Sequence, residues 1–178
     1  MLKFDEKLLR TQTIFDGKFI KVTKDDVELS TGKESFREVV KHPGGVVIVA
    51  LKIDGNGKTV LMVKQYRYPI KQVSLELPAG KLDYGENPDL AAKRELEEET
   101  GHIAKNWQSL GFIYTTPGFC DEKLYLYLAT DLEFTKQNPD EGEIIEYFEY
   151  NLDNLFEMIK NGEINDAKTI CALMRAFG

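Results

Sequence analysis

The helix expected between Asn87 and Gly101 constrains the fold more than any other segment, because both of its ends carry strong local signals. Asn87 can cap the free N–H groups of a first turn, and Pro88 suits the first helical position. Gly101 accepts the left-handed conformation that ends many helices. Ala92 and Leu96 lie four residues apart between these signals. The segment therefore predicts one helix of about three turns with a narrow apolar stripe.

The same helix carries a crowded acidic face. Glu95 and Glu99 are four residues apart and Glu98 lies beside them, so three carboxylates share one side. Like charges at this spacing repel, and a hard divalent cation with oxygen ligands would offset the repulsion. The alternative interpretation is a solvated acidic face. In that case Arg94 would pair with Glu98, and each such pair would contribute only about 0.3 kcal/mol.

The residues around this helix follow a fixed spacing, namely Gly80, then five residues, Glu86, then seven residues, and the run from Arg94 to Gly101. Position for position, this spacing resembles the signature of the Nudix hydrolase family. The family usually closes the signature with an aliphatic residue, whereas this chain has His102, which we interpret as a packing substitution at the helix exit. The resemblance implies cleavage of a nucleoside diphosphate that is linked to another group.

The resemblance also implies a divalent-metal site on the acidic face. It makes Glu95 and Glu99 the principal metal ligands, with Glu98 as a further ligand and catalytic group. The backbone carbonyl of Ala79, in the preceding loop, is expected to approach these carboxylates. Hard ions take such oxygens and Mg²⁺ usually keeps waters, so Mg²⁺ is the expected cofactor, with Mn²⁺ as a substitute. Arg94 is expected to serve catalysis by orienting the glutamates, since a guanidinium can bind a carboxylate bidentately.

Composition limits the classes of protein to which the chain can belong. The 178 residues carry a net charge of −7, with 30% charged and 42% hydrophobic residues, as expected for one globular domain with its own core. The negative charge argues against nucleic acid as the main partner. No apolar run approaches the length of a membrane span and the N-terminus lacks a signal-peptide stretch, so we expect a cytoplasmic protein. Cys120 and Cys171 show no metal-ligand spacing and suggest no disulfide framework.

The hydrophobic pattern elsewhere predicts mainly strands. The expected strands are Phe19–Leu29, Ser35–Val40, Val46–Leu51, Val60–Val63, Ser74–Leu77, Trp107–Tyr114, Leu124–Thr130 and Ile144–Tyr150. Helical spacing returns in residues 154–160 and 166–177. Strands and helices without regular βαβ alternation predict an α+β domain. The Nudix resemblance implies an α/β/α sandwich with a mixed sheet, residues 43–178, after an N-terminal antiparallel β extension, residues 1–42.

Three further stretches narrow the resemblance. They are Gln65–Pro69, Glu76–Gly80 and Thr116–Glu122, and the third places Pro117 15 residues beyond the signature. Together they resemble the ADP-ribose pyrophosphatase subfamily. The alternative for Pro117-Gly118 alone is a plain turn between strands. Together the stretches imply ADP-ribose as the substrate, with AMP and ribose 5-phosphate as products.

The subfamily resemblance implies the residues that contact the substrate. Arg37 and Arg67 are the expected phosphate-binding arginines, because a guanidinium presents a planar fork of donors. Ordinary surface charge on a strand is the alternative for Arg37. The resemblance adds Pro117, Gly118 and Glu122 as expected substrate contacts.

In this subfamily the general base lies outside the signature, on a loop near the C-terminal strand. The corresponding loop here spans residues 138–146. A Gly-Glu pair followed by two apolar residues and a glutamate places Glu143 in the base position. Glu141 is the near alternative, and Glu122 is a third carboxylate outside the signature.

Two other functions remain open. The substrate can instead be another nucleotide sugar or a nucleoside triphosphate, or the chain can be a non-catalytic Nudix ligand-binding module. The intact signature argues against the binding module.

The subfamily resemblance also implies a homodimer in which N-terminal strands complete the partner's adenine pocket. Arg37 or Phe19 is then expected near the partner's site.

Overall fold

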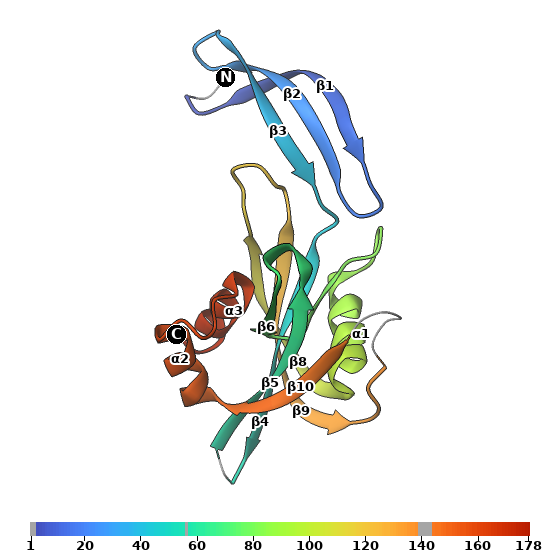
Figure 1. Cartoon of the computed structure of the whole chain (residues 1–178), viewed down its shortest axis with the longest axis vertical. Coiled ribbons are helices and arrows are strands. Elements are labelled where there is room, and N and C mark those ends of the chain that lie inside the picture. Colours follow the sequence, from blue (N-terminus) through green and yellow to red (C-terminus); the bar gives the residue numbers. More distant parts are fainter. Residues whose placement is uncertain (1–2, 56, 139–143) are drawn as a thin grey trace. The chain divides into compact units, whose positions relative to one another are not determined.

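The computed structural model describes residues 3–55, 57–138 and 144–178. The chain divides into two compact units, the first comprising residues 1–44 and 114–123 and the second residues 45–113 and 124–178. Figure 1 labels most of the helices and strands of both units. In the described part of the chain, no helix is both long enough and apolar enough to cross a membrane.

The first unit contains a three-stranded antiparallel sheet. Its strands β1 (Glu6–Asp16), β2 (Lys21–Leu29) and β3 (Glu34–Lys41) follow the order β1-β2-β3. The sheet confirms the predicted N-terminal antiparallel extension. The sequence-based prediction began at Phe19 and missed β1. Every residue of β1 is exposed, so this strand lacks the alternation of buried and exposed positions that predicts a half-buried strand.

The segment 114–123 of the first unit runs beside the end of β3. The Val40 N–H donates to the Phe119 carbonyl at 2.8 Å, and the Asp121 N–H donates to the Val40 carbonyl at 3.1 Å. Thr116 accepts hydrogen bonds from the N–H groups of Phe119 and Cys120, at 3.1 and 2.9 Å. The residues between them, Pro117 and Gly118, therefore lie in a tight turn.

The second unit is built on a mixed sheet with the order β10-β5-β4-β9-β8, in which β6 also pairs with β5 and β7 with β4. The strands are β4 (Gly45–Asp54), β5 (Gly57–Arg67), β6 (Gln72–Glu76), β7 (Ala79–Lys81), β8 (His102–Tyr114), β9 (Lys123–Phe134) and β10 (Ile145–Asn151). Strand β4 runs parallel to β9, whereas β5 runs antiparallel to β4, β6 and β10. The predicted mixed sheet is confirmed.

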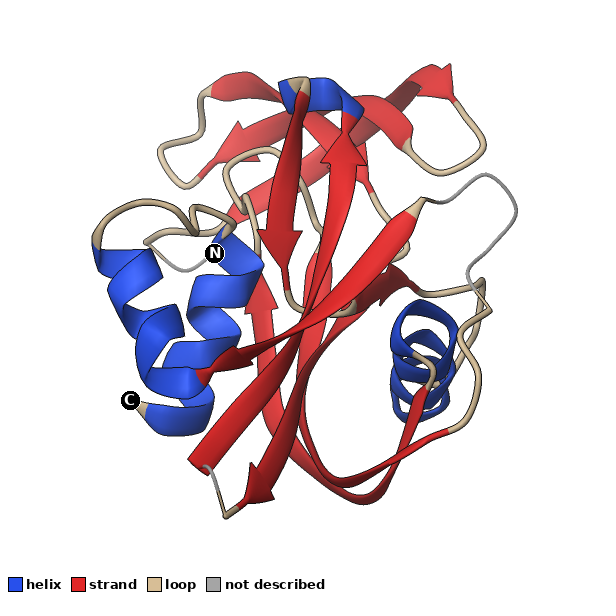
Figure 2. Ribbon diagram, turned by 60° about the horizontal axis from the view of Figure 1, so that its bottom comes forward, coloured by secondary structure: helices blue, strands red, loops and turns tan. Residues whose placement is uncertain are grey.

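Helices cover both faces of this sheet. Helix α1 (Pro88–Thr100) lies on one side, and α2 (Leu152–Lys160) and α3 (Ala167–Phe177) lie on the other (Figure 2). Strand β4 shows why, because its side chains alternate between two cores. Ile48 packs in the cluster that includes Leu96 of α1, whereas Val49 packs in the cluster that includes Leu173 of α3. The α/β/α sandwich is therefore confirmed.

Most of the predicted elements of this unit are present, although several ends differ. The prediction did not include β7 or the short 3-10 helix η1 (Tyr68–Ile70). Strand β7 has only three residues and forms by pairing with Gly45–Val47 of β4. Such a short strand depends on its partner and leaves no periodic pattern in its own sequence.

Candidate active site

Helix α1 begins and ends as the sequence predicts. The Asn87 side chain accepts a hydrogen bond from the Asp89 N–H at 2.7 Å, and Pro88 occupies the first turn. Gly101 has φ +68° and donates its N–H to the Glu97 carbonyl at 2.8 Å. Ala92 and Leu96 are fully buried against the sheet. Burial of this stripe sets the rotation of the helix and thus the side on which its glutamates project.

Arg94 links three carboxylates around the start of the acidic face. Its Nε and Nη2 donate to the two oxygens of Glu86, each at 3.1 Å. Its Nη1 donates to Glu95 and to Glu98, each at 2.8 Å. These contacts raise the pKa of Arg94, chiefly through Glu86, and the hydrogen bonds from Arg94 lower the pKa of Glu86. One guanidinium thus ties the loop before α1 to two of the three expected metal-ligating glutamates.

Strand β7 lies directly against the same face. The Ala79 N–H donates to the buried Glu99 carboxylate at 2.9 Å. A Cβ atom at Gly80 would lie 1.8 Å from the carboxyl carbon of Glu95, so only glycine lets the backbone approach so closely. The structure therefore places the backbone of β7 against Glu95 and Glu99, and the contact with Glu99 is made by the Ala79 N–H. The expected approach of the Ala79 carbonyl to these carboxylates stays a prediction.

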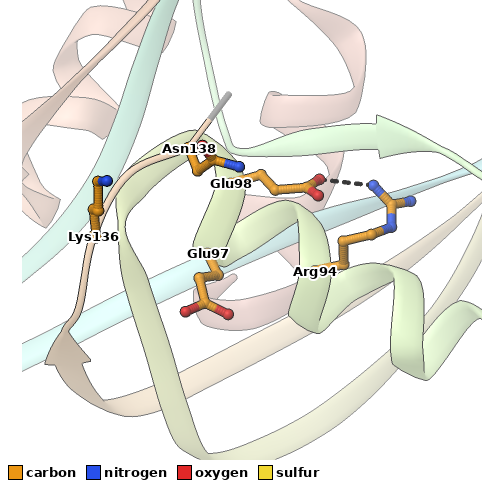
Figure 3. A pocket seen from close by; sticks show the side chains of 5 residues that line it. All are labelled: Arg94, Glu97, Glu98, Lys136 and Asn138. Carbon is orange, nitrogen blue, oxygen red and sulfur yellow. Dashed lines mark hydrogen bonds and ion pairs between the residues drawn. The ribbon is translucent and has the colours of Figure 1, made fainter. Parts of the chain in front are cut away.

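A pocket of about 420 Å³ opens beside the end of α1 (Figure 3). It is lined by Arg94, Glu97, Glu98, Lys136 and Asn138. In this view Glu98 points toward Arg94, whereas Glu97 points away from it. The segment after β9 forms one wall, because the Asn138 N–H donates to the Glu98 carbonyl at 3.1 Å and the Gln137 amide to the Glu99 carbonyl at 2.6 Å.

The acidic face has the donor chemistry of a site for a hard divalent cation. One oxygen of Glu95 and one of Glu98 share the same nitrogen of Arg94, so the two carboxylates lie close together. Among the described residues, no three acidic, histidine or cysteine side chains converge as a preformed metal cage. Mg²⁺ commonly binds through one or two carboxylates together with waters and substrate phosphates. The residues therefore fit Mg²⁺ in that mode.

His102 occupies the last position of the signature and is buried. Its Nδ1 lies 2.8 Å from the Thr100 carbonyl oxygen, so it is placed to donate a hydrogen bond there. The rings of Phe134 and Tyr147 pack edge-on against the imidazole ring, with distances between ring centroids of 5.3 and 5.4 Å. Burial lowers the pKa of His102 and favours the neutral ring. These contacts agree with a packing role.

Arg67 lies at the end of β5, where it binds the buried carboxylate of Glu76. Its Nε donates to one oxygen of Glu76 at 2.9 Å and its Nη2 to the other at 2.5 Å. The pKa of Arg67 is raised, chiefly by the hydrogen bond with Glu76, and the charge of Glu99 contributes to the shift.

The other expected substrate contacts belong to the first unit. Arg37 is paired with Glu6 of β1 and donates to the Phe36 carbonyl at 2.7 Å. Glu122 accepts a hydrogen bond from the Thr115 hydroxyl at 2.7 Å and lies 3.4 Å from the His42 ring. Pro117 and Gly118 form the exposed turn described above. The expected base Glu143 and its alternative Glu141 lie outside the described residues.

Two family models together match most of the chain. The model described as NUDIX domain matches residues 41–173, and the model described as nucleoside diphosphate sugar hydrolase N-terminal domain matches residues 6–40. The chain belongs to the Nudix family. Nudix proteins typically use a divalent metal ion, in agreement with the oxygen donors on α1.

Individual relatives of this Nudix chain match it over almost its whole length. The ADP-ribose pyrophosphatase of Bacillus subtilis (strain 168) is 42% identical over 175 residues, which cover 97% of this chain and 93% of the relative. The methanol dehydrogenase activator of Bacillus methanolicus is 43% identical over 173 residues, covering 96% and 91%. A crystal structure of an ADP compounds hydrolase has a TM-score of 0.82 at 22% identity, covering 96% and 91%, and supports the fold alone.

Sequence reasoning missed part of the surroundings of the Nudix signature. It did not identify Lys136 and Asn138 as pocket residues, and it did not pair Lys168 with Glu76. A glutamate between two leucines in an expected strand was a usable signal for a buried ion pair at Glu76. Nothing local marks Lys168 as its partner, because the two residues are separated by 92 positions.

Proposed function

We propose that this Nudix protein hydrolyses the pyrophosphate bond of ADP-ribose, giving AMP and ribose 5-phosphate, with Mg²⁺ as cofactor. The observation that carries the proposal is the 42% identity, over 97% of the chain, to the ADP-ribose pyrophosphatase of Bacillus subtilis. The acidic face of α1 agrees with it, because its carboxylates offer the oxygen ligands that a metal–pyrophosphate complex needs.

In this proposal Glu95, Glu98, Glu99 and the Ala79 carbonyl hold Mg²⁺, and Mn²⁺ can substitute. Bound Mg²⁺ would polarise a phosphoryl oxygen, lower the pKa of water and neutralise developing charge. Arg94 keeps Glu95 and Glu98 in place through the two 2.8 Å hydrogen bonds of its Nη1. Fixing these side chains before the substrate arrives spares their ordering during the reaction.

Glu143 is the proposed general base, which takes a proton from the attacking water. The water oxygen bonds to one phosphorus, the P–O–P bridge breaks, and the leaving phosphate accepts the electron pair. Gln137 and Asn138, which precede Glu143 in the chain, are held against α1 by hydrogen bonds, and this supports the proposal. Arg67 is the proposed phosphate ligand of the second unit.

In the first unit, Arg37, Pro117, Gly118 and Glu122 are the proposed substrate contacts. Arg37 already binds a carboxylate through two donors, the arrangement that a phosphate would also satisfy. The proposed substrate is a nucleoside diphosphate compound, and neither nucleic acid nor membrane is needed for the reaction.

We further propose that residues 1–42 form a dimerisation extension and that residues 43–178 form the hydrolase domain. Strand β1 is an edge strand with every residue exposed. Large apolar side chains of the same unit are more than half exposed, namely Ile14, Phe15, Phe19 and Phe36. A second copy of the chain would cover this edge, and its apolar residues would provide a wall for adenine.

The test is the rate of hydrolysis with Mg²⁺ across ADP-ribose, GDP- and UDP-sugars and nucleoside triphosphates. We expect ADP-ribose to have the highest kcat/KM, and chelation of the metal to abolish turnover. If another nucleotide sugar or a nucleoside triphosphate has a higher kcat/KM, that compound is the substrate and the assignment of ADP-ribose is wrong. Tight binding of ADP-ribose without turnover of any compound would favour a binding module.

A further inference from the structure

Glu76 is a buried carboxylate with two cationic partners. Its side chain is 2% exposed. Arg67 approaches through two donors, and the Lys168 ammonium donates to one of the same two oxygens. One counter-charge is enough for Glu76 itself, so either cation could neutralise it, and Lys168 is shared with a second carboxylate, Asp166.

The two cations differ in how firmly they are held. The Lys168 side chain is 15% exposed, and its ammonium also binds Asp166, the N-cap of α3, at 3.0 Å. The Arg67 side chain is 38% exposed and binds Glu76. Arg67 is therefore the cation that can turn outward, whereas Lys168 stays beside Glu76.

Space for such a movement lies next to the pair. A hollow of about 300 Å³ is bordered by Arg67, Ser74, Glu76 and Lys168, among others. Burial alone disfavours the charged form of Glu76, yet the hydrogen bonds of Arg67 and the charge of Lys168 lower its pKa to about 2. With both cations bound, Glu76 is therefore charged.

We propose that Lys168 is a positioning residue that keeps Glu76 neutralised while Arg67 exchanges Glu76 for a phosphate of the substrate. The inference rests on the proposed function, in which Arg67 binds that phosphate. Without Lys168, outward movement of Arg67 would leave an unpaired buried carboxylate, which is strongly unfavourable. Arg67 would then remain on Glu76 and bind substrate weakly.

The kinetic test compares Lys168→Met with the wild type on ADP-ribose. We expect KM to rise by about tenfold, the scale of one hydrogen bond to a charged group, while kcat changes much less. Adding Glu76→Gln to Lys168→Met should restore KM, because Arg67 is then no longer held by a charge. Lys160→Met, which removes an exposed lysine paired with Glu157, is the matched control and should leave KM unchanged.

A second measurement needs no substrate. Arg67→Gln should lower Tm slightly in the wild type, where Lys168 still neutralises Glu76, and by several times more in the Lys168→Met background. Equal Tm shifts in the two backgrounds would overturn the inference, as would a KM that Glu76→Gln fails to restore. If the wild-type protein neither hydrolyses nor binds nucleoside diphosphate sugars, the proposed function is wrong, and the Tm coupling still decides whether Lys168 replaces Arg67.

Discussion

Arg94 explains how an acidic face can exist on α1. Glu95, Glu98 and Glu99 would repel one another on a bare helix, and each like-charge contact there costs a few tenths of a kcal/mol, about 0.3. In the structure Arg94 binds Glu95 and Glu98, and the Ala79 N–H binds Glu99. Each carboxylate of the face is therefore hydrogen-bonded within the protein.

Glu99→Gln should lower turnover by about two orders of magnitude or more while the fold is retained, because it removes a negative ligand at constant size. Steady-state kinetics at saturating Mg²⁺ and a Tm measurement check this. Glu157→Gln, an exposed change on α2, is the control and should have no effect on turnover. Near-full activity of Glu99→Gln would refute the metal assignment.

Glu143→Gln should reduce kcat far more than it raises KM, because a general base acts in the transition state. Glu141→Gln should lower kcat only slightly. The two variants are compared by kcat and KM on ADP-ribose. The reverse order of effects would move the base by two residues along the loop.

Glu76 should make stability depend on acid pH. The pKa of Glu76 is lowered from 4.5 to about 2. Its contribution to the free energy of unfolding is therefore fully present above a pH of about 4.5 and is lost as the pH falls toward 2. A pKa shift of this size corresponds to a contribution of about 3 kcal/mol. Urea unfolding from pH 6 down to about 2 checks it, with Glu76→Gln as the comparison. Parallel losses in the two proteins would assign the acid sensitivity to other groups.

At the scale of elements, the start of α3 is tied to the strand that leads into the site. The Thr169 hydroxyl donates to Asp166 at 2.6 Å and accepts from the Leu77 N–H at 2.9 Å. Leu77 follows β6 and stands two residues before Ala79, whose N–H binds Glu99. A helix on one face of the sheet thus helps to position the backbone that meets α1 on the other face.

Thr169→Val should therefore destabilise the protein by about 1–3 kcal/mol, because it leaves the buried Leu77 N–H without an acceptor. Thr169→Ser keeps the hydroxyl and loses one methyl group, so it should cost about 1 kcal/mol. Chemical denaturation of both variants measures the difference. A valine variant as stable as the wild type would show that this hydrogen bond contributes little.

At the scale of the whole molecule, the first unit presents surface that a single chain leaves open. Strand β1 is an exposed edge, and Ile14 and Phe15 on it are 58% and 54% exposed. Edges of this kind pair readily with another chain unless something covers them. This surface is the reason to expect a second copy of the chain.

Light scattering at assay concentration should therefore give the mass of two chains. Ile14→Lys should shift the protein toward one chain and lower its activity, since a charge would be buried in the interface. Ile53→Lys, at a similarly exposed position of β4, is the control and should leave the mass unchanged. A wild-type monomer with full activity would exclude the dimer as the active form.

The sequence by itself determined the features that depend on neighbouring residues. The cap at Asn87, the stop at Gly101 and the buried stripe of Ala92 and Leu96 follow from backbone preference and helical period. The alternating β4 strand and its hairpin with β5 follow from the same local rules. Together with the spacing of the signature, these features were enough to predict the sandwich and the acidic face.

Only the tertiary structure decided the pairings between distant residues. Strands β1 and β7 and the contact of Lys168 with Glu76 leave no periodic trace in the sequence. Hydrogen bonds and ion pairs of this kind form where packing of the sheet and helices brings side chains together. Their geometry depends on that packing, whereas caps, stops and amphipathic stripes depend on residues only a few positions apart.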